Sequence, residues 1–198
     1  MVMPAIPRFL LFLSPCFVLP LSAQTAPDID ILHTKTDLLF DWKKRQASGE
    51  ATITLRIVAP ARAISLAADE LDVKSVQTAD RQNLAFDYKP GSTHLDIQLV
   101  RAYAAEETLT LVIAYNTLHH NDPDPNALGG SFGKGLRFFS PTAVNPVKRK
   151  QVWSQGELQN NSCWFPCTRN ISDLHTSELF ATVDSELTVI SNGKLVET

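Results

Sequence analysis

The sequence predicts an all-β protein built from antiparallel sheets, arranged as a sandwich or a curved, saddle-like stack. Short runs alternate between polar and apolar residues, which is typical of strands that bury one face. Turn-forming residues separate these runs, and no long stretch has helical periodicity. Strands at this density without crossover helices pair in antiparallel sheets. The 198 residues are enough for one domain with a sizeable core.

The first predicted strand is long and extends from Ile29 to Trp42. The polar residues from Lys43 to Gly49 suit a hairpin loop that ends in glycine. The next run, Ala51–Val58, alternates strictly and is ended by Pro60.

Five shorter runs follow, with turn residues at positions 80–83 and 89–92 between them. They are Ala63–Leu66, Leu71–Val76, Leu84–Tyr88, His94–Val100 and Thr108–Tyr115. The pattern then breaks in a polar insertion rich in glycine and proline, from Asn116 to Gly135, and loops of this length are often functional or mobile.

Residues 1–23 resemble a secretory signal, so we expect an exported protein, periplasmic or extracellular, whose mature domain spans residues 24–198. Arg8 precedes an apolar stretch, and Leu21-Ser22-Ala23 suits cleavage by a signal peptidase. A membrane anchor is the alternative, but the stretch is short and interrupted by Pro15 and Pro20, which argues against a stable membrane span.

The charge balance of the mature chain argues against nucleic acid as a partner. Cleavage removes Arg8 and no acidic residue, which leaves 17 Lys and Arg against 21 Asp and Glu, a net charge of −4. Phosphate backbones require a basic surface. Two cysteines remain, Cys163 and Cys167, and an exported chain can join them in a disulfide. Metal ligation by the pair is less favoured, because no second Cys or His pair follows at zinc-finger spacing.

The most informative segment is Gln151–Cys167, which reads QVWSQGELQNNSCWFPC. It is followed by Thr176-Ser177-Glu178 and by a run that closes on Ser191-Asn192-Gly193. This ordered string resembles the N-terminal saddle domain of the aminopeptidase N-type zinc metallopeptidases, in which Trp-(Ser/Thr)-Gln-Gly-Glu precedes Phe-Pro-Cys, Thr-Ser-Glu and a strand that closes on Ser-Asn-Gly. The resemblance is strongest over residues 135–198 and extends back to Ile29.

The resemblance implies a zinc enzyme whose metal lies in a catalytic domain that would follow Thr198 and be the partner of this one. The family's His-Glu-x-x-His and Gly-Ala-Met-Glu-Asn motifs are absent from the sequence. None of the histidines has the required spacing; they are His33, His94, His119, His120 and His175. We therefore expect no cofactor in this chain, zinc in the full-length enzyme, and no peptide hydrolysis by this chain alone.

The resemblance also assigns roles to Gln155 and Glu157 at the N-terminus of a peptide substrate. In the family, the Gln lines the pocket for the first side chain, and the acidic residue two positions later holds the free α-amino group. A carboxylate suits an ammonium ion, because a charge-assisted hydrogen bond provides both attraction and register. If residues 155–157 are extended, both side chains point to the same face. The alternative is that both merely decorate the edge of a strand.

The sequence departs from the family pattern around this segment. Ser162 replaces an Arg that commonly precedes Phe-Pro-Cys, and Arg169 replaces an Asp that follows it, whereas Asp173 is kept. Ile171 and Leu174 stand in place of Pro and Lys. Arg169 either reverses a charge beside the cleft or pairs with a neighbouring acid at the surface. These departures keep open an alternative function as a diverged, non-catalytic binding or scaffold module, whose exposed apolar face would favour association.

Overall fold

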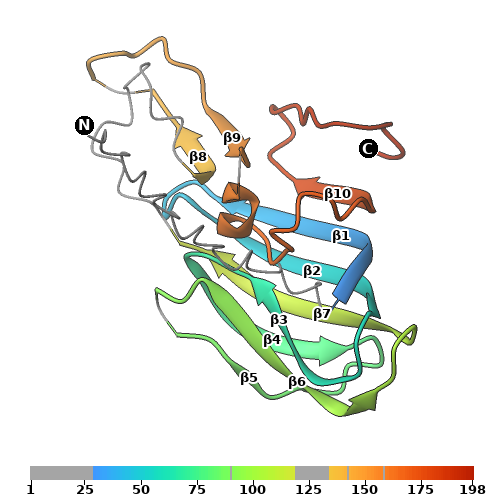
Figure 1. Ribbon diagram of the computed structural model, residues 1–198. Coiled ribbons are helices and arrows are strands. Elements are labelled where there is room, and N and C mark those ends of the chain that lie inside the picture. Colours follow the sequence, from blue (N-terminus) through green and yellow to red (C-terminus); the bar gives the residue numbers. More distant parts are fainter. Residues whose placement is uncertain (1–28, 90, 119–133, 142, 158) are drawn as a thin grey trace, which may run out of the picture.

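The strands form three sheets in the computed structural model, which describes residues 29–198 apart from 90, 119–133, 142 and 158 (Figure 1). The predicted signal segment and most of the polar insertion lie outside the described residues. The largest sheet has the order β10 (Thr176–Thr182), β1 (Ile29–Asp41), β2 (Gln46–Ile57), β7 (Thr108–Thr117) and β4 (Leu71–Thr78). The second has the order β3 (Ala61–Ala67), β6 (His94–Tyr103) and β5 (Phe86–Asp87). A hairpin of β8 (Gly135–Phe139) and β9 (Gln151–Gln155) forms the third.

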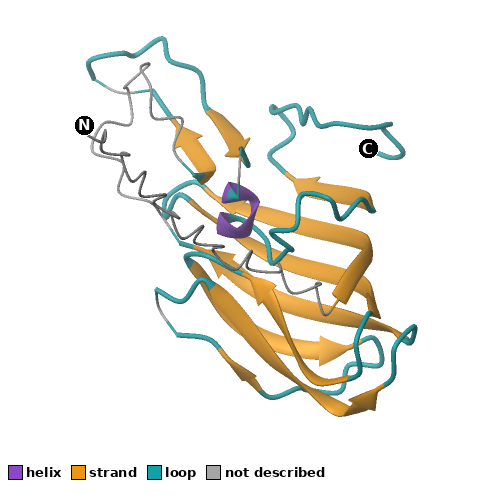
Figure 2. Ribbon diagram, in the orientation of Figure 1, coloured by secondary structure: helices purple, strands orange, loops and turns teal. Residues whose placement is uncertain are grey.

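The prediction of an all-β fold in layered sheets is confirmed. The five-stranded and three-stranded sheets face each other as two layers (Figure 2). A short 3₁₀ helix, η1 (Asn160–Cys163), is the one helical element within the described part of the chain. No helix there is long and apolar enough to cross a membrane.

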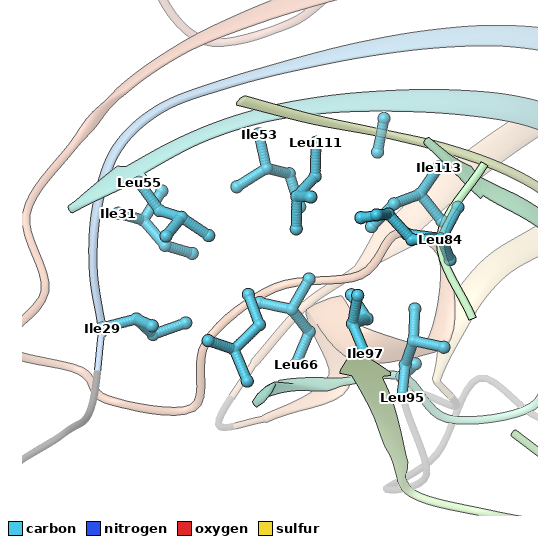
Figure 3. Close-up of a cluster of buried hydrophobic side chains, with 14 of the residues drawn as sticks. Ile29, Ile31, Ile53, Leu55, Leu66, Leu84, Leu95, Ile97, Leu111 and Ile113 are labelled. Atoms are coloured by element: carbon cyan, nitrogen blue, oxygen red, sulfur yellow. The ribbon is translucent and has the colours of Figure 1, made fainter. Parts of the chain in front are cut away.

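The core lies between these two sheets because their strands alternate as the sequence predicts. In β2, Ala47, Ala51, Ile53, Leu55 and Ile57 are all buried, while the residues between them are partly or fully exposed. Side chains from the larger sheet, among them Ile53 and Leu111, point toward Leu66 and Ile97 of the smaller one (Figure 3). Burying such aliphatic side chains contributes roughly 1.5–3 kcal/mol each.

Two expectations about the first hairpin and the last strands are wrong. The loop expected over Lys43–Gly49 is shorter, because β2 begins at Gln46 and pairs with β1 up to Asp41. Arg45, with a φ of 54°, adopts the left-handed conformation that closes this tight turn.

The terminal strand also differs in position and direction. The expected strand closing on Ser191-Asn192-Gly193 is not formed; the last strand is β10, and residues 183–198 contain no strand. β10 pairs parallel to β1, in an otherwise antiparallel sheet, with a register from His33–Thr176 to Leu39–Thr182. Because β1 ends at Asp41, the chain beyond Thr182 has little further strand to pair with on that edge.

Tyr115 on β7 shows how tightly the core is packed. Its ring lies so close to Gly49 of β2 that any side chain at this glycine would collide with it. Its hydroxyl is buried and has no hydrogen-bond partner among the described residues. Burial raises the pKa of this phenol well above its ordinary value, since the charged form would lose its hydration.

We predict that Tyr115→Phe leaves the free energy of unfolding unchanged or raises it by about 1 kcal/mol, because it removes a buried hydroxyl that makes no hydrogen bond. The matched control is Tyr88→Phe. The Tyr88 hydroxyl accepts a hydrogen bond from the Leu71 amide (3.1 Å) and donates one to the Ala68 carbonyl (3.2 Å). This control is expected to lose about 1–3 kcal/mol. Urea titration of the three proteins measures both changes, and a larger loss in Tyr115→Phe than in Tyr88→Phe would contradict the assignment.

Candidate functional site

The candidate site lies at the end of the β8–β9 hairpin, where Gln155 is the last residue of β9. Opposed pairs run from Gly135–Gln155 to Phe139–Gln151. Residues two apart on a strand share a face, so Arg137 and Phe139 lie on the same face as Trp153 and Gln155. Gln155 therefore shares one side of a small, two-stranded sheet with these three side chains.

The other side of the hairpin packs on the end of β1 and on the residue that follows it. The Phe138 ring meets the Phe40 ring at 6.3 Å and the Trp42 ring at 5.5 Å, both edge to face. Such pairs contribute about 0.5–1.5 kcal/mol beyond the area they bury. The aromatic contacts attach the hairpin to the sandwich and leave the Gln155 face turned outward.

The extended segment that would place Gln155 and Glu157 on one face is not formed. The strand ends at Gln155, and Glu157 belongs to the following turn, so the two are not both in an extended segment. Their side chains nevertheless meet, with 3.5 Å between the Gln155 Nε2 and Glu157 Oε2 atoms. Glu157 is exposed and Gln155 is half-buried. A carboxylate and a neighbouring amide on the surface can together bind an ammonium group and a polar or apolar group beside it.

Gly156 permits the turn that brings these side chains together. A side chain at this position would collide with the side-chain amide of Asn161 on η1. The Asn161 Oδ1 atom in turn accepts a hydrogen bond of 3.0 Å from the Trp164 indole nitrogen. Gly135, opposite Gln155, has a φ of 59°, and a Cβ there would lie 2.8 Å from the Cys163 carbonyl oxygen. Both glycines therefore let the hairpin and η1 approach closely.

Asp69, in the turn between β3 and β4, anchors η1 to the body of the domain. Its backbone amide donates a hydrogen bond of 2.8 Å to the Ser162 carbonyl. Its carboxylate accepts hydrogen bonds from the Ser162 hydroxyl and from Arg169 Nη2, the latter at 2.5 Å. Backbone hydrogen bonds of 2.8 and 3.0 Å between Ala67 and Cys167 continue this attachment. The anchor thus joins both ends of the segment from Ser162 to Arg169.

The structure decides between the two interpretations of Arg169. Its side chain is 27% exposed and that of Asp69 17%, so the ion pair is partly withdrawn from water. Arg169 is the partner of a neighbouring acid. Ser162 is fully buried beneath the same carboxylate. Asp69 itself could not have been found from the sequence, because it lies 93 and 100 residues before its two partners and carries no motif.

Asp173, the acidic residue that the sequence keeps, is also structural. Its side chain is 2% exposed, and its Oδ2 atom accepts a hydrogen bond of 3.2 Å from the Ile31 amide. The amide lies where β1 shifts register between Ile31 and His33. The carboxylate therefore supports a β-bulge.

Cys163 and Cys167 are both buried and are free thiols in the structure, so the disulfide that the sequence permits is not present in it. Burial raises the pKa of the Cys163 thiol to about 11 and that of the Cys167 thiol to about 12. Within the described ranges, no group of three or more His, Cys, Asp or Glu side chains is placed to hold a metal ion.

Comparisons with known proteins place this geometry in a wider context. The family model described as the Peptidase M1 N-terminal domain matches residues 30–198. An M1 zinc metallopeptidase from Deinococcus radiodurans, solved as a mutant bound to Tyr-Ser-Ala substrate, is 20% identical with a TM-score of 0.58; the match covers 78% of this chain and 32% of that one. Yeast LTA4 hydrolase in complex with Bestatin is also 20% identical, with a TM-score of 0.58, over 79% of this chain and 24% of that one. Both likenesses show the fold.

Two proteins named as transcription factor subunits match this chain over a shorter stretch of sequence. Transcription initiation factor TFIID subunit 2 of Gallus gallus is 38% identical over 66 residues, which are 32% of this chain and 6% of that protein. The same subunit from Danio rerio is 36% identical over 66 residues. This chain thus spans only a small part of the relatives it matches.

We predict that Asp69→Asn lowers the free energy of unfolding by about 2–3 kcal/mol, because it leaves Arg169 without its partner in a partly buried site. The matched control is Glu50→Gln, which breaks an ion pair with Arg81 at the surface and is expected to lose less than about 1 kcal/mol. Urea titrations provide both values. Equal losses for the two variants would show that Asp69 does not anchor η1.

We also predict that both thiols of the reduced, folded chain are alkylated at least about a hundredfold more slowly at pH 8 than in urea. Only the thiolate reacts, and burial keeps it scarce by raising both pKa values above the ordinary 9.0. Because the folded state holds these protons more tightly, stability falls as the pH rises above 9. Iodoacetamide labelling followed by mass spectrometry measures the rates, and rapid labelling of either cysteine in the folded chain would refute the prediction.

Proposed function

The chain belongs to the family of peptidase M1 N-terminal domains, and we propose that it caps a zinc-containing catalytic domain and binds the N-terminus of a peptide substrate. In this proposal Glu157 receives the free α-amino group and Gln155 contacts the first residue of the peptide. The single observation that carries the proposal is the pairing of these two side chains, 3.5 Å apart, on the outward face of the hairpin.

The chemistry of the pair suits this role. An exposed carboxylate attracts an ammonium ion, and the neighbouring amide provides a donor and an acceptor at a fixed place. Gln155 is held by its strand, and Glu157 by the turn at Gly156 that packs on η1. A site held on such a support loses little conformational entropy when a ligand binds. Zinc would be held by residues of the catalytic domain, and the proposed reaction of the whole enzyme is metal-dependent removal of N-terminal residues from peptides.

A second function, a non-catalytic binding or scaffold module, is favoured by the match to transcription initiation factor TFIID subunit 2. The name of that protein describes a subunit of an assembly. The exposed apolar side chains of β10, Leu179 and Phe180, offer such a module a surface for another chain. This function requires neither zinc nor Glu157.

The N-terminal segment supports a proposal about location. Residues 1–23 have the charge, apolar stretch and small residues of a secretory signal. We propose that the protein is exported to a periplasmic or extracellular space, where a peptide-trimming enzyme would meet peptides from outside the cell. N-terminal sequencing of the secreted protein, expected to start at Gln24, tests this step.

We predict that, in the protein joined to its zinc domain, Glu157→Gln raises KM and lowers kcat/KM for an aminoacyl chromogenic substrate by about tenfold or more. The change removes the charge from the proposed amine site and costs about 1.5–3 kcal/mol of binding. Asp87→Asn, an exposed change on β5, is the matched control and is expected to have no effect. The 198-residue chain alone should show no turnover with added zinc. Wild-type activity in Glu157→Gln would reject the amine site, and inactivity of the joined protein with intact zinc binding would favour the scaffold function.

A further inference from the structure

Trp153 is the large aromatic side chain exposed beside the Gln155–Glu157 pair. It lies two residues before Gln155 on β9 and so shares its face. The side chain is 59% exposed, although a buried tryptophan would contribute much more to stability. The aromatic surface is therefore available to a ligand at the place where the proposed amine site begins.

The Trp153 ring packs beside Phe139. The Phe139 ring lies 5.5 Å away at a tilt of 55°. Phe139 is itself stacked by the Lys148 ammonium at 4.6 Å and the Arg137 guanidinium at 5.8 Å. These cations cover Phe139, so Trp153 is the ring of this pair that presents its surface outward.

η1 closes the surface on one side of Gln155. Gly135 has no side chain, and the place that its Cβ would take is filled by Cys163 of η1. Trp153 and Gln155 share one face of β9, and Glu157 lies in the turn beyond them with its side chain beside that of Gln155. Trp153 and Gln155 are successive residues on one face of β9 and so are about 6.5 Å apart, and the Gln155 and Glu157 side chains meet 3.5 Å apart. An α-amino group bound where these two side chains meet leaves a long first side chain able to reach the Trp153 ring.

We propose that Trp153 is a specificity-determining residue that selects peptides whose first residue is aromatic or large and apolar. This inference rests on the proposed function, since Glu157 would hold the α-amino group while the first side chain passes Gln155 and lies on the Trp153 ring. Aromatic pairs contribute about 0.5–1.5 kcal/mol. The expected preference for a phenylalanine over a glycine is therefore about three- to tenfold in affinity.

Three small probes separate the aromatic contact from the amine contact: phenylalaninamide, glycinamide and N-acetylphenylalaninamide. Each is titrated into the 198-residue chain, labelled with ¹⁵N, and the indole N–H signal of Trp153 and the backbone signals of Gln155 and Gly156 are followed. The Trp153 signal is assigned by its loss in Trp153→Phe. The expected result is that phenylalaninamide shifts these signals and binds about three- to tenfold more tightly than glycinamide.

Variants complete the test. Trp153→Ala should remove the difference between phenylalaninamide and glycinamide, Trp153→Phe should retain part of it, and Phe180→Ala, an exposed aromatic on another sheet, should leave it unchanged. The proposal is overturned if phenylalaninamide does not shift the indole signal, or if the preference persists in Trp153→Ala.

The titrations distinguish failure of the amine site at Glu157 from failure of the aromatic contact at Trp153. If N-acetylphenylalaninamide binds as tightly as phenylalaninamide and Trp153→Ala weakens both, the amine site is wrong and the aromatic contact stands. If glycinamide binds as tightly as phenylalaninamide and Glu157→Gln weakens both equally, the amine site stands and the specificity role of Trp153 is rejected.

Discussion

The candidate site depends on the carboxylate of Asp69. This one group, in a turn of the sandwich, accepts hydrogen bonds from Ser162 at one end of a short segment and from Arg169 at the other. Between these residues lie both cysteines and the backbone bridge to Ala67. The segment has almost no regular structure of its own, since its single 3₁₀ turn covers four residues. Hydrogen bonds to an ionised group are stronger than neutral ones, and a partly buried pair is less screened by water. Because Gly135 packs on Cys163 of this segment and Gly156 packs on the preceding residue, Asn161, the positions of Gln155 and Glu157 depend on it.

This arrangement changes how the departures from the family pattern are interpreted. Compared with the family pattern one at a time, Ser162 lacks a positive charge and Arg169 reverses a negative one, and both changes suggest a damaged site. In the structure they form a single unit with Asp69: a small hydroxyl fits beneath the carboxylate, and the positive charge lies on the other side of it. The cation that pairs with Asp69 is Arg169 itself. The substitutions therefore leave the support of Gln155 and Glu157 intact, and they carry less weight for a loss of function than the sequence suggests.

The alternation of polar and apolar residues predicted the strands of the sandwich, but it could not predict which distant segments pair with one another. The alternation in β2 and β7 follows directly from burial of one face, so their residues could be placed from the sequence. The parallel pairing of β10 could not, because it joins His33 to a residue 143 positions later and nothing in Thr176–Thr182 indicates its direction. The same limit applies to the site. The pair Gln155–Glu157 was found through a resemblance over a short motif, whereas Asp69 and the exposed ring of Trp153 become visible only when distant segments are brought together.

The two proposed functions make different demands on the same surface. A scaffold needs an exposed apolar surface that another chain covers. The exact positions of the side chains in that surface can change as long as its apolar area is kept. A site that receives an α-amino group must instead hold a carboxylate within hydrogen-bonding distance of one place. Several contacts fix the backbone near Glu157. Two glycines lie in close contact with η1, the Asn161 side chain accepts a hydrogen bond from the Trp164 indole, and the Arg169–Asp69 ion pair attaches the supporting segment to the sandwich. By contrast, Leu179 and Phe180 lie exposed on β10, an edge strand held by its pairing with β1 and by Lys35, whose ammonium lies 4.4 Å from the Phe180 ring. This difference in local rigidity is the physical reason for preferring the peptide-binding role.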